Sequence, residues 1–276
     1  MLYSNVKFIP IFSCIVLYLI LVRNNSARKL FLLVASYYIY ALWDYRFLSL
    51  LMGATALDFL VGRGLGKVTS PAARKMLLGV SVVGNLGKLG FFKYYNFFIA
   101  SLEPLLSEFG LKPGTLNIIL PLGISFYTFQ SLTYTIEVYR GTLKSDWSLL
   151  DFALFVGFFP QLAAGPIVRA AHFLPQLQIA QEITWLGFFE GFRRFTFGFF
   201  KKLFVADRLG LFVDNFFDNP GAFDCLTTWL GVAAYSLQLY CDFSGYSDMA
   251  IGVARIMGYR LGENFNYPYL AQLPRA

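Results

Sequence analysis

The chain has 276 residues, of which 57% are hydrophobic, 19% are aromatic and only 14% are charged, and its mean hydropathy is +0.56. Soluble domains carry about 25% charged residues, so this composition excludes a water-facing globular protein and predicts an integral membrane protein. The formal net charge of +7 comes from basic residues clustered in short loops. These loops indicate the cytoplasmic side of a membrane protein and not a nucleic-acid surface.

Few side chains suited to metal or disulfide chemistry are present. Cys14, Cys225 and Cys241 are scattered along the chain, and His172 is its single histidine. This spacing indicates neither a disulfide framework nor a set of metal ligands. We therefore predict no metal site, no bound cofactor and no nucleic-acid partner.

The first apolar run covers residues 8–22 and is followed by Arg23, Asn24, Asn25 and Arg28. A secretory signal peptide ends in a cleavage site of small residues, and no such site follows this run. We predict a retained first membrane helix.

A transmembrane helix needs about 20 predominantly apolar residues. Several of the apolar segments are short or interrupted, and basic residues within 185–217 favour a re-entrant or interfacial position. Helices that break at membrane depth need protein or water around them. The sequence therefore predicts one all-α domain over residues 1–276, a polytopic transmembrane helix bundle with broken and interfacial helices around a tunnel. In chain order, the apolar segments are 6–22, 30–43, 47–62, 76–100, 116–139, 149–168, 185–200, 203–217 and 226–258.

The basic loops define an orientation in the membrane. Residues 23–29 and 63–75 are both rich in Lys and Arg. A hairpin or helix break at residues 43–46 gives an even number of crossings between them, which places both loops in the cytoplasm. The N-terminus is then outside, and the later return of the chain places Arg140 and Lys144 inside as well.

The stretch PLGISFYTFQSLTYTIEVYRG, residues 121–141, is an apolar helix that begins near Pro121 and Gly123 and is rich in hydroxyl side chains. Small and hydroxylated residues pack membrane helices together. The same residues also suit the wall of an internal tunnel, and both interpretations stay open.

The motif GFFPQLAAGPIVRAAHFLPQL contains Pro160 and Pro166, each of which removes a backbone donor and disfavours helical geometry in the preceding residue. We expect the freed carbonyl groups to accept hydrogen bonds from Gln161 and Arg169. The segment is either a kinked helix that ends at the membrane interface or a broken helix that lines a site. His172 follows these prolines, and we assign it no catalytic role.

In the motif FGFFKKLFVADRLGLFVD, Lys201, Lys202 and Arg208 lie among apolar and aromatic residues. One interpretation is an amphipathic helix at the membrane interface, whose lysines keep their ammonium groups in water. The alternative is a donor-side basic patch that contacts an acidic donor, such as a carrier protein or a phosphorylated thioester, and is completed by Asp207 beside Arg208.

The stretch YCDFSGYSDMAIG places charges inside an apolar segment. In a helix with about 100° per residue, Asp248 and Arg255 lie within about 40° of Ser244, whereas Asp242 lies about 160° away. Asp248 and Arg255 are about two turns apart, so we expect each to have partners on other helices. An ionisable residue in a membrane helix indicates a functional site by default. The alternative is a polar cluster that only locks helices together.

The stretch GENFNYPYLA follows this helix. Pro268 stops helical structure, and Asn264 and Asn266 are suited to hydrogen-bonded loops. We predict a turn that leads into a further segment.

Several of these stretches together resemble the membrane-bound O-acyltransferase (MBOAT) family, in the bacterial branch that includes alginate O-acetyltransferases and the D-alanyl transfer protein of teichoic acid synthesis. The likeness covers roughly residues 35–271 and follows the order of the family's motifs. The stretches that carry it are PLGISFYTFQ, FFPQLAAGPIVR, KKLFVAD, YCDFSGYSDMAIG and GENFNYPYLA.

The resemblance implies a tunnel through the inner membrane and transfer of an acyl group, expected to be acetyl. The donor would be a cytoplasmic thioester, acetyl-CoA or an acyl carrier protein, and the acceptor would be a hydroxyl of an extracytoplasmic polysaccharide such as alginate. Partners would be the lipid bilayer, the donor or carrier, and an extracytoplasmic acyltransferase or other polysaccharide machinery. The residues expected to line or support the tunnel are Gln161, Arg169, Asp242, Ser244, Asp248, Arg255, Asn264 and Asn266.

A hydroxyl needs a base of near-neutral pKa to attack a thioester, and histidine has that pKa. In the family, the histidine that serves as base and a second one in an Arg-Trp-His segment come after the NFNYPY region. His172 matches neither position, so we expect no catalytic residue within this chain. We expect the chain to be the N-terminal part of a longer enzyme and to insert in the membrane without transferring an acyl group by itself. A catalytically inactive membrane scaffold and a transporter are the alternatives.

The orientation leads to a labelling prediction. A cysteine placed at Ser70, in a variant without Cys14, Cys225 and Cys241, should react with a membrane-impermeant maleimide only after the cells are opened, because residues 63–75 are expected in the cytoplasm. Efficient labelling in intact cells would overturn this orientation.

Overall fold

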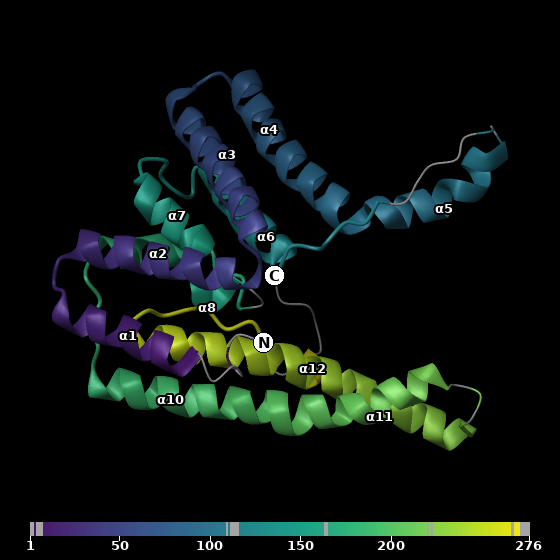
Figure 1. The fold of residues 1–276 in the computed structure, drawn as a ribbon. Coiled ribbons are helices and arrows are strands. Elements are labelled where there is room, and N and C mark those ends of the chain that lie inside the picture. The colour runs from purple at the N-terminus through teal and green to yellow at the C-terminus, as the bar shows by residue number, and fades with distance from the viewer. Residues whose placement is uncertain are drawn as a thin grey trace. The chain divides into compact units, whose positions relative to one another are not determined.

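The computed structural model describes residues 3, 8–108, 110, 116–162, 165–219, 221, 223–265 and 268–270. Within these ranges every regular element is a helix and no strand occurs (Figure 1). The predicted all-α class is therefore confirmed.

The chain divides into two compact units. The first comprises Met1–Arg28, Ala164–Val168 and Gln176–Ala276, and the second comprises Lys29–Ala163 and Arg169–Pro175. The first unit thus combines the two ends of the sequence, and the second holds most of its middle.

The helices follow this division, and the short turn η3 (Leu174–Gln178) runs from the second unit into the first. The first unit contains α1 (Phe8–Leu21), α10 (Trp185–Phe200), the π-helical segment η4 (Lys201–Ala206), α11 (Asp207–Asp218), α12 (Cys225–Ile256) and η6 (Pro268–Leu270). The second contains most of α2 (Asn25–Asp44), then η1 (Tyr45–Phe47), α3 (Leu48–Lys67), α4 (Pro71–Leu89), the π-helical segment η2 (Gly90–Tyr94), α5 (Tyr95–Glu108), α6 (Ile124–Arg140), α7 (Leu149–Gly157), α8 (Phe159–Leu162) and α9 (Ala170–Phe173).

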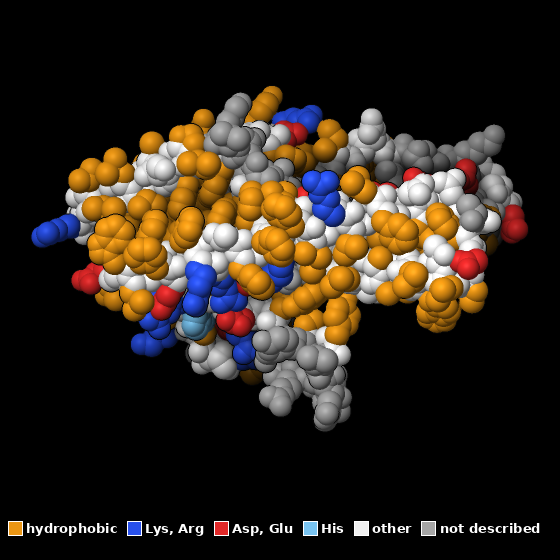
Figure 2. Space-filling model, turned by 90° about the horizontal axis from the view of Figure 1, so that it is seen from below, with side chains coloured by type: hydrophobic (Ala, Val, Ile, Leu, Met, Phe, Trp, Pro, Cys, Tyr) orange, Lys and Arg blue, Asp and Glu red, His pale blue; other side chains and the backbone are white. Residues whose placement is uncertain are grey.

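Two helical stretches of the described chain are long and apolar enough to cross a membrane: Asn25–Lys67, with 43 residues, and Pro71–Glu108, with 38 residues. Helix α1 is apolar but shorter. The expected segment 116–139 is helical only from Ile124 onward. Hydrophobic side chains cover much of the face shown in Figure 2, as a surface in contact with lipid requires.

The expected interruption at residues 43–46 is confirmed. The Asp44 carboxylate accepts a hydrogen bond from the backbone N–H of Arg46 at 3.0 Å and pairs with the Arg46 guanidinium at 2.6 Å. The 3-10 turn η1 follows, and α3 continues in a different direction from α2 (Figure 1). The local cap supplied by Asp44 therefore fixes where the helix breaks.

A buried carboxylate joins α3, α4 and α6 in the second unit. Asp58 on α3 is fully buried and accepts hydrogen bonds from Ser81 and Asn85 on α4 and from Thr135 on α6. Among the described residues, no basic side chain forms an ion pair with it. Several neutral donors therefore stabilise this carboxylate inside an apolar bundle.

Glutamine amides replace a helical hydrogen bond between α7 and α8. In a continuous helix the carbonyl of Phe155 would accept from the N–H of Phe159. Instead it accepts from Gln161 at 2.7 Å and from Gln130 at 2.6 Å, while the Phe159 N–H donates to the Ser36 hydroxyl at 3.1 Å. The prediction that Gln161 caps a freed carbonyl is confirmed.

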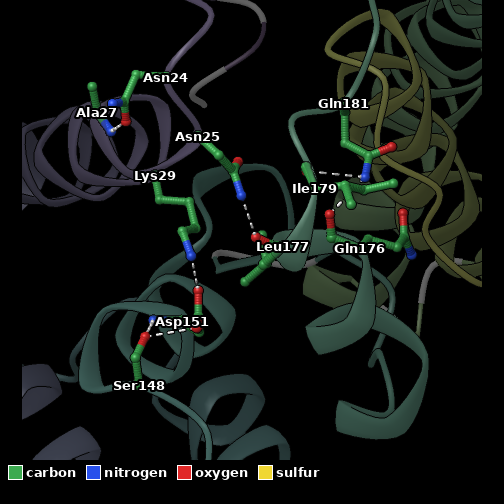
Figure 3. Close-up of polar contacts among 10 residues, drawn as sticks. All are labelled: Asn24, Asn25, Ala27, Lys29, Ser148, Asp151, Gln176, Leu177, Ile179 and Gln181. Atoms are coloured by element: carbon green, nitrogen blue, oxygen red, sulfur yellow. Dashed lines mark hydrogen bonds and ion pairs between the residues drawn. The ribbon is translucent and has the colours of Figure 1, made fainter.

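Figure 3 shows two polar contacts of helix α2, one in each unit. In the first unit, the Asn25 amide donates to the Leu177 carbonyl at 2.9 Å. In the second, Lys29 Nζ lies 2.6 Å from a carboxylate oxygen of Asp151, whose other oxygen accepts from the Ser148 hydroxyl at 2.6 Å. Lys29 and Asp151 are both buried, so each neutralises the other where water cannot.

Candidate functional site

Helices α10 and α12 of the first unit contact one another through their backbones (Figure 1). A β-carbon on Gly191 would lie 2.5 Å from the carbonyl oxygen of Gly252, and one on Gly198 would lie 2.5 Å from that of Gly245. Only glycine allows so close an approach. Gly191 precedes Gly198 but meets the later glycine of α12, so the two helices run antiparallel.

This close approach brings the Asp248 carboxylate into contact with two cations. Asp248 lies 3.0 Å from Arg194 on α10 and pairs with Lys201, the first residue of η4. Lys201 also donates to the Ser244 hydroxyl at 3.1 Å. Ser244 and Asp248 therefore share one face of α12, and their partners lie on other helical segments, as the sequence predicted.

A second set of ion pairs continues along the same face. Arg255 donates through Nε and Nη2 to one oxygen of Glu190, at 2.9 and 2.7 Å. Arg194, already bound to Asp248, donates to Glu263 at 2.8 Å. Asp248 and Arg255 thus bind separate partners, which confirms the expectation that they do not pair with each other.

Lys202 forms a third group on another side of α12. Its ammonium lies 2.6 Å from both Asp207 and Asp242. Asp242, predicted to lie about 160° from Ser244 around the helix, therefore binds a different cation from Asp248. Of the three residues predicted as a donor-side basic patch, Lys201 and Lys202 are paired with carboxylates, whereas Arg208 is exposed on α11.

Asn264 joins the segment after α12 to a loop of the same unit. Its side-chain oxygen accepts from the backbone N–H of Ile167 at 3.3 Å. This hydrogen bond connects two of the sequence motifs, GPIVR and GENFNYPYLA. Asn266, the other asparagine predicted there, lies outside the described residues.

Gln161, Arg169 and His172 belong to the second unit. Arg169 is exposed at the N-cap of α9, and among the described residues its guanidinium donates to no freed carbonyl, so the expected cap is absent there. His172 is exposed on the same short helix. Among the described residues, Gln161 alone therefore has the capping role predicted for this motif.

An open cleft of about 830 Å³ lies over the ion pairs of the first unit. Its charged lining comprises Glu190, Arg193, Arg194, Asp248, Arg255, Arg260 and Glu263. Among the described residues the lining contains no serine, cysteine or histidine, and no group of side chains there could hold a metal ion. This arrangement can bind and orient a charged ligand.

Sequence reasoning assigned no role in the site to Glu190 or to the glycines of α10 and α12. The signal was available, because Gly191 and Gly198 are seven residues apart and so are Gly245 and Gly252. Such spacing places small residues on one helical face, where membrane helices approach closely. Pairing the two spacings would have predicted the α10–α12 contact.

Residues 138–269 match the MBOAT, membrane-bound O-acyltransferase family. A probable alginate O-acetylase, AlgI, from Pseudomonas putida is 45% identical over 99% of this chain and 56% of its own length. A peptidoglycan O-acetyltransferase from Helicobacter pylori is 35% identical over 90% of this chain and 52% of its own. A teichoic acid D-alanyltransferase from Bacillus subtilis is 32% identical over 63% of this chain and 45% of its own.

The chain spans about half the length of the curated relatives that it matches. The matched family region includes α10, η4, α11 and α12, and so the whole of the ion-pair network.

The glycine contact leads to a stability prediction. Gly191→Ala should lower the free energy of unfolding by about 1–3 kcal/mol, because the new methyl group overlaps the Gly252 backbone and must push the helices apart. Thermal unfolding of the detergent-solubilised protein, followed by size-exclusion chromatography, measures this change. Gly79→Ala on α4 is the matched control, since a methyl group there meets open space. Equal stability of the two variants would contradict the close contact.

Proposed function

This chain belongs to the membrane-bound O-acyltransferase family, and on that premise we propose that the protein transfers an acetyl group to hydroxyls of an extracytoplasmic polysaccharide such as alginate. The observation that carries the proposal is the 45% identity to a probable alginate O-acetylase along 99% of the chain. The more distant relatives are named for other acceptors, peptidoglycan and teichoic acid. A polymer that carries hydroxyl groups is the acceptor class that fits all of these names.

The donor in this proposal is a thioester, acetyl-CoA or an acyl carrier protein, and it is a substrate and not a resident cofactor. In this proposal the protein lies in the inner membrane as a multi-pass helix bundle, whose tunnel connects the donor on one side with the acceptor on the other. Its partners are the donor or carrier on the cytoplasmic side and the polysaccharide machinery on the other side. The two apolar helical stretches and the exposed hydrophobic side chains support the membrane location.

The described residues contribute support and orientation to this reaction. Asp248, held by Arg194 and Lys201, fixes the relative position of α10, η4 and α12. Acyl transfer also needs a base for the hydroxyl and donors for the oxyanion. We assign the base to no residue of this chain, because His172 matches neither of the positions at which the family has its histidines.

Complementation tests the proposal. The protein encoded by the whole gene should restore O-acetyl esters to the exopolysaccharide of an alginate-producing strain that lacks its own O-acetylase. Nuclear magnetic resonance of the secreted polymer measures the ester content. Polymer without acetyl groups, at normal membrane levels of the protein, would reject the proposal and favour an inactive scaffold or a transporter.

Asp248→Asn separates a positioning role from a purely structural one. The substitution keeps the size of the side chain but removes the charge that Arg194 and Lys201 share. We expect acetyl transfer per folded protein to fall about tenfold or more, equivalent to about 1.4 kcal/mol in the activation barrier. The measurement combines ester content with the amount of folded protein in the membrane. Turnover close to the wild type would leave Asp248 with a structural role only.

A further inference from the structure

We propose that the cleft over α10 and α12 binds the headgroup of an acidic phospholipid, with the phosphate held between Arg193 and Arg260. The proposal goes beyond acyl transfer, because it concerns a lipid ligand that is neither donor nor acceptor. It depends on the charge of the cleft, on the position of each arginine and on the surface next to them.

Arg193 and Arg260 are the cations of the cleft lining that form no ion pair with a described carboxylate. Each acidic side chain of the lining has a cationic partner: Glu190 pairs with Arg255, Glu263 with Arg194, and Asp248 with Arg194 and Lys201. Arg193 and Arg260 also line the cleft, yet within the described part of the chain neither forms an ion pair. An anion can therefore enter without displacing an internal carboxylate.

A glycine turn and the side chain of Gln176 hold the backbone of Arg260 in place. Helix α12 ends in a glycine turn, with Gly258 at φ +91° and the Tyr259 N–H bonded to the Ala254 carbonyl at 2.9 Å. The Gln176 side chain then binds both backbone groups of Arg260, accepting from its N–H at 2.8 Å and donating to its carbonyl at 2.9 Å. The side chain of Arg260 is exposed, and the backbone that carries it is held at a fixed position beside the cleft. A preorganised guanidinium loses less entropy when it binds a phosphate.

Arg193 lies between two exposed aromatic side chains. Phe189, Arg193 and Phe197 follow at four-residue spacing, which places them on one ridge of α10. Phe189 is 63% exposed and Phe197 is 60% exposed, and Phe197 also lines the cleft. A cation flanked by exposed aromatic rings fits an amphiphile whose headgroup is anionic and whose chains are apolar. A free phosphate or a soluble sugar acid would leave the exposed surface of both rings uncovered.

The position of the cleft also agrees with an acidic phospholipid. Gln176 binds Arg260, and Asn25 of the basic loop donates to the adjacent Leu177 carbonyl, so the cleft and this loop lie at the same end of the first unit. The sequence predicts that residues 23–29 face the cytoplasm. Cytoplasmic leaflets carry the anionic lipids that basic pockets bind.

Short-chain phosphatidylglycerol, titrated into the purified protein in a neutral detergent, tests the proposal. We expect binding that weakens about fivefold in Arg193→Gln and in Arg260→Gln, and about thirtyfold in the double variant, at about 1 kcal/mol for each arginine. The matched control is the double variant Arg140→Gln/Lys144→Gln, which removes the same charge from exposed positions in the second unit and should bind like the wild type. Native mass spectrometry counts the bound lipid, and size-exclusion chromatography confirms folding. Each single variant is informative if the double variant cannot be recovered.

Three further ligands distinguish the sources of the phosphate. Phosphatidylcholine of the same chain length should bind at least tenfold more weakly, and inorganic phosphate and coenzyme A should not displace phosphatidylglycerol. Equal binding of phosphatidylcholine would show a purely apolar site and overturn the proposal. Displacement by inorganic phosphate or coenzyme A would show a site for soluble phosphates and would also overturn it. Unchanged binding in the double variant would place the lipid elsewhere on the protein.

Discussion

The backbone contact between α10 and α12 is the constraint on which the polar network of the first unit depends. Arg194 lies between Gly191 and Gly198, and Asp248 lies between the matching glycines of α12. An aspartate side chain is short, so it reaches a neighbouring helix only where the two axes come close. The glycine pairs therefore decide the spacing, and the ion pairs fix the rotation of each helix about its axis.

Asp58 in the second unit and Asp248 in the first are stabilised by different means. Asp58 is surrounded by hydroxyl and amide donors from neighbouring helices, whereas Asp248 is neutralised by Arg194 and Lys201. A cluster of ion pairs is sensitive to the loss of any one member, because removal of one charge leaves its partner uncompensated. A cluster of neutral donors depends instead on geometry and survives the loss of one donor at a lower cost. The charged cluster borders the open cleft of the first unit.

Much of the helical arrangement could be predicted from the sequence, because apolar length and helical periodicity are local properties. The segment predicted at 226–258 corresponds to α12 at Cys225–Ile256, and the periodicity placed Ser244 and Asp248 on one face. The partners on α10 could not be identified, because a local sequence pattern does not indicate which helices pack against each other in the folded protein. Asp58 was missed for the same reason, since its donors come from two other helices. The apolar segment 149–168 divides into α7 and α8 near Pro160, where a kink or break was predicted, but the contacts of this break with Gln130 and Ser36 could not be predicted because they come from distant segments.

The π-helical segment η4 constrains the number of residues between α10 and α11. Its wider turn lets the consecutive residues Lys201 and Lys202 reach carboxylates on two sides of α12. Deletion of one residue there would restore the α-helical turn and rotate everything that follows by about 100°. Gly210 on α11, where a β-carbon would lie 3.0 Å from the Gln238 amide, would then face away from α12. In this segment, which has the composition of an ordinary amphipathic helix, the number of residues is therefore constrained as tightly as their identity.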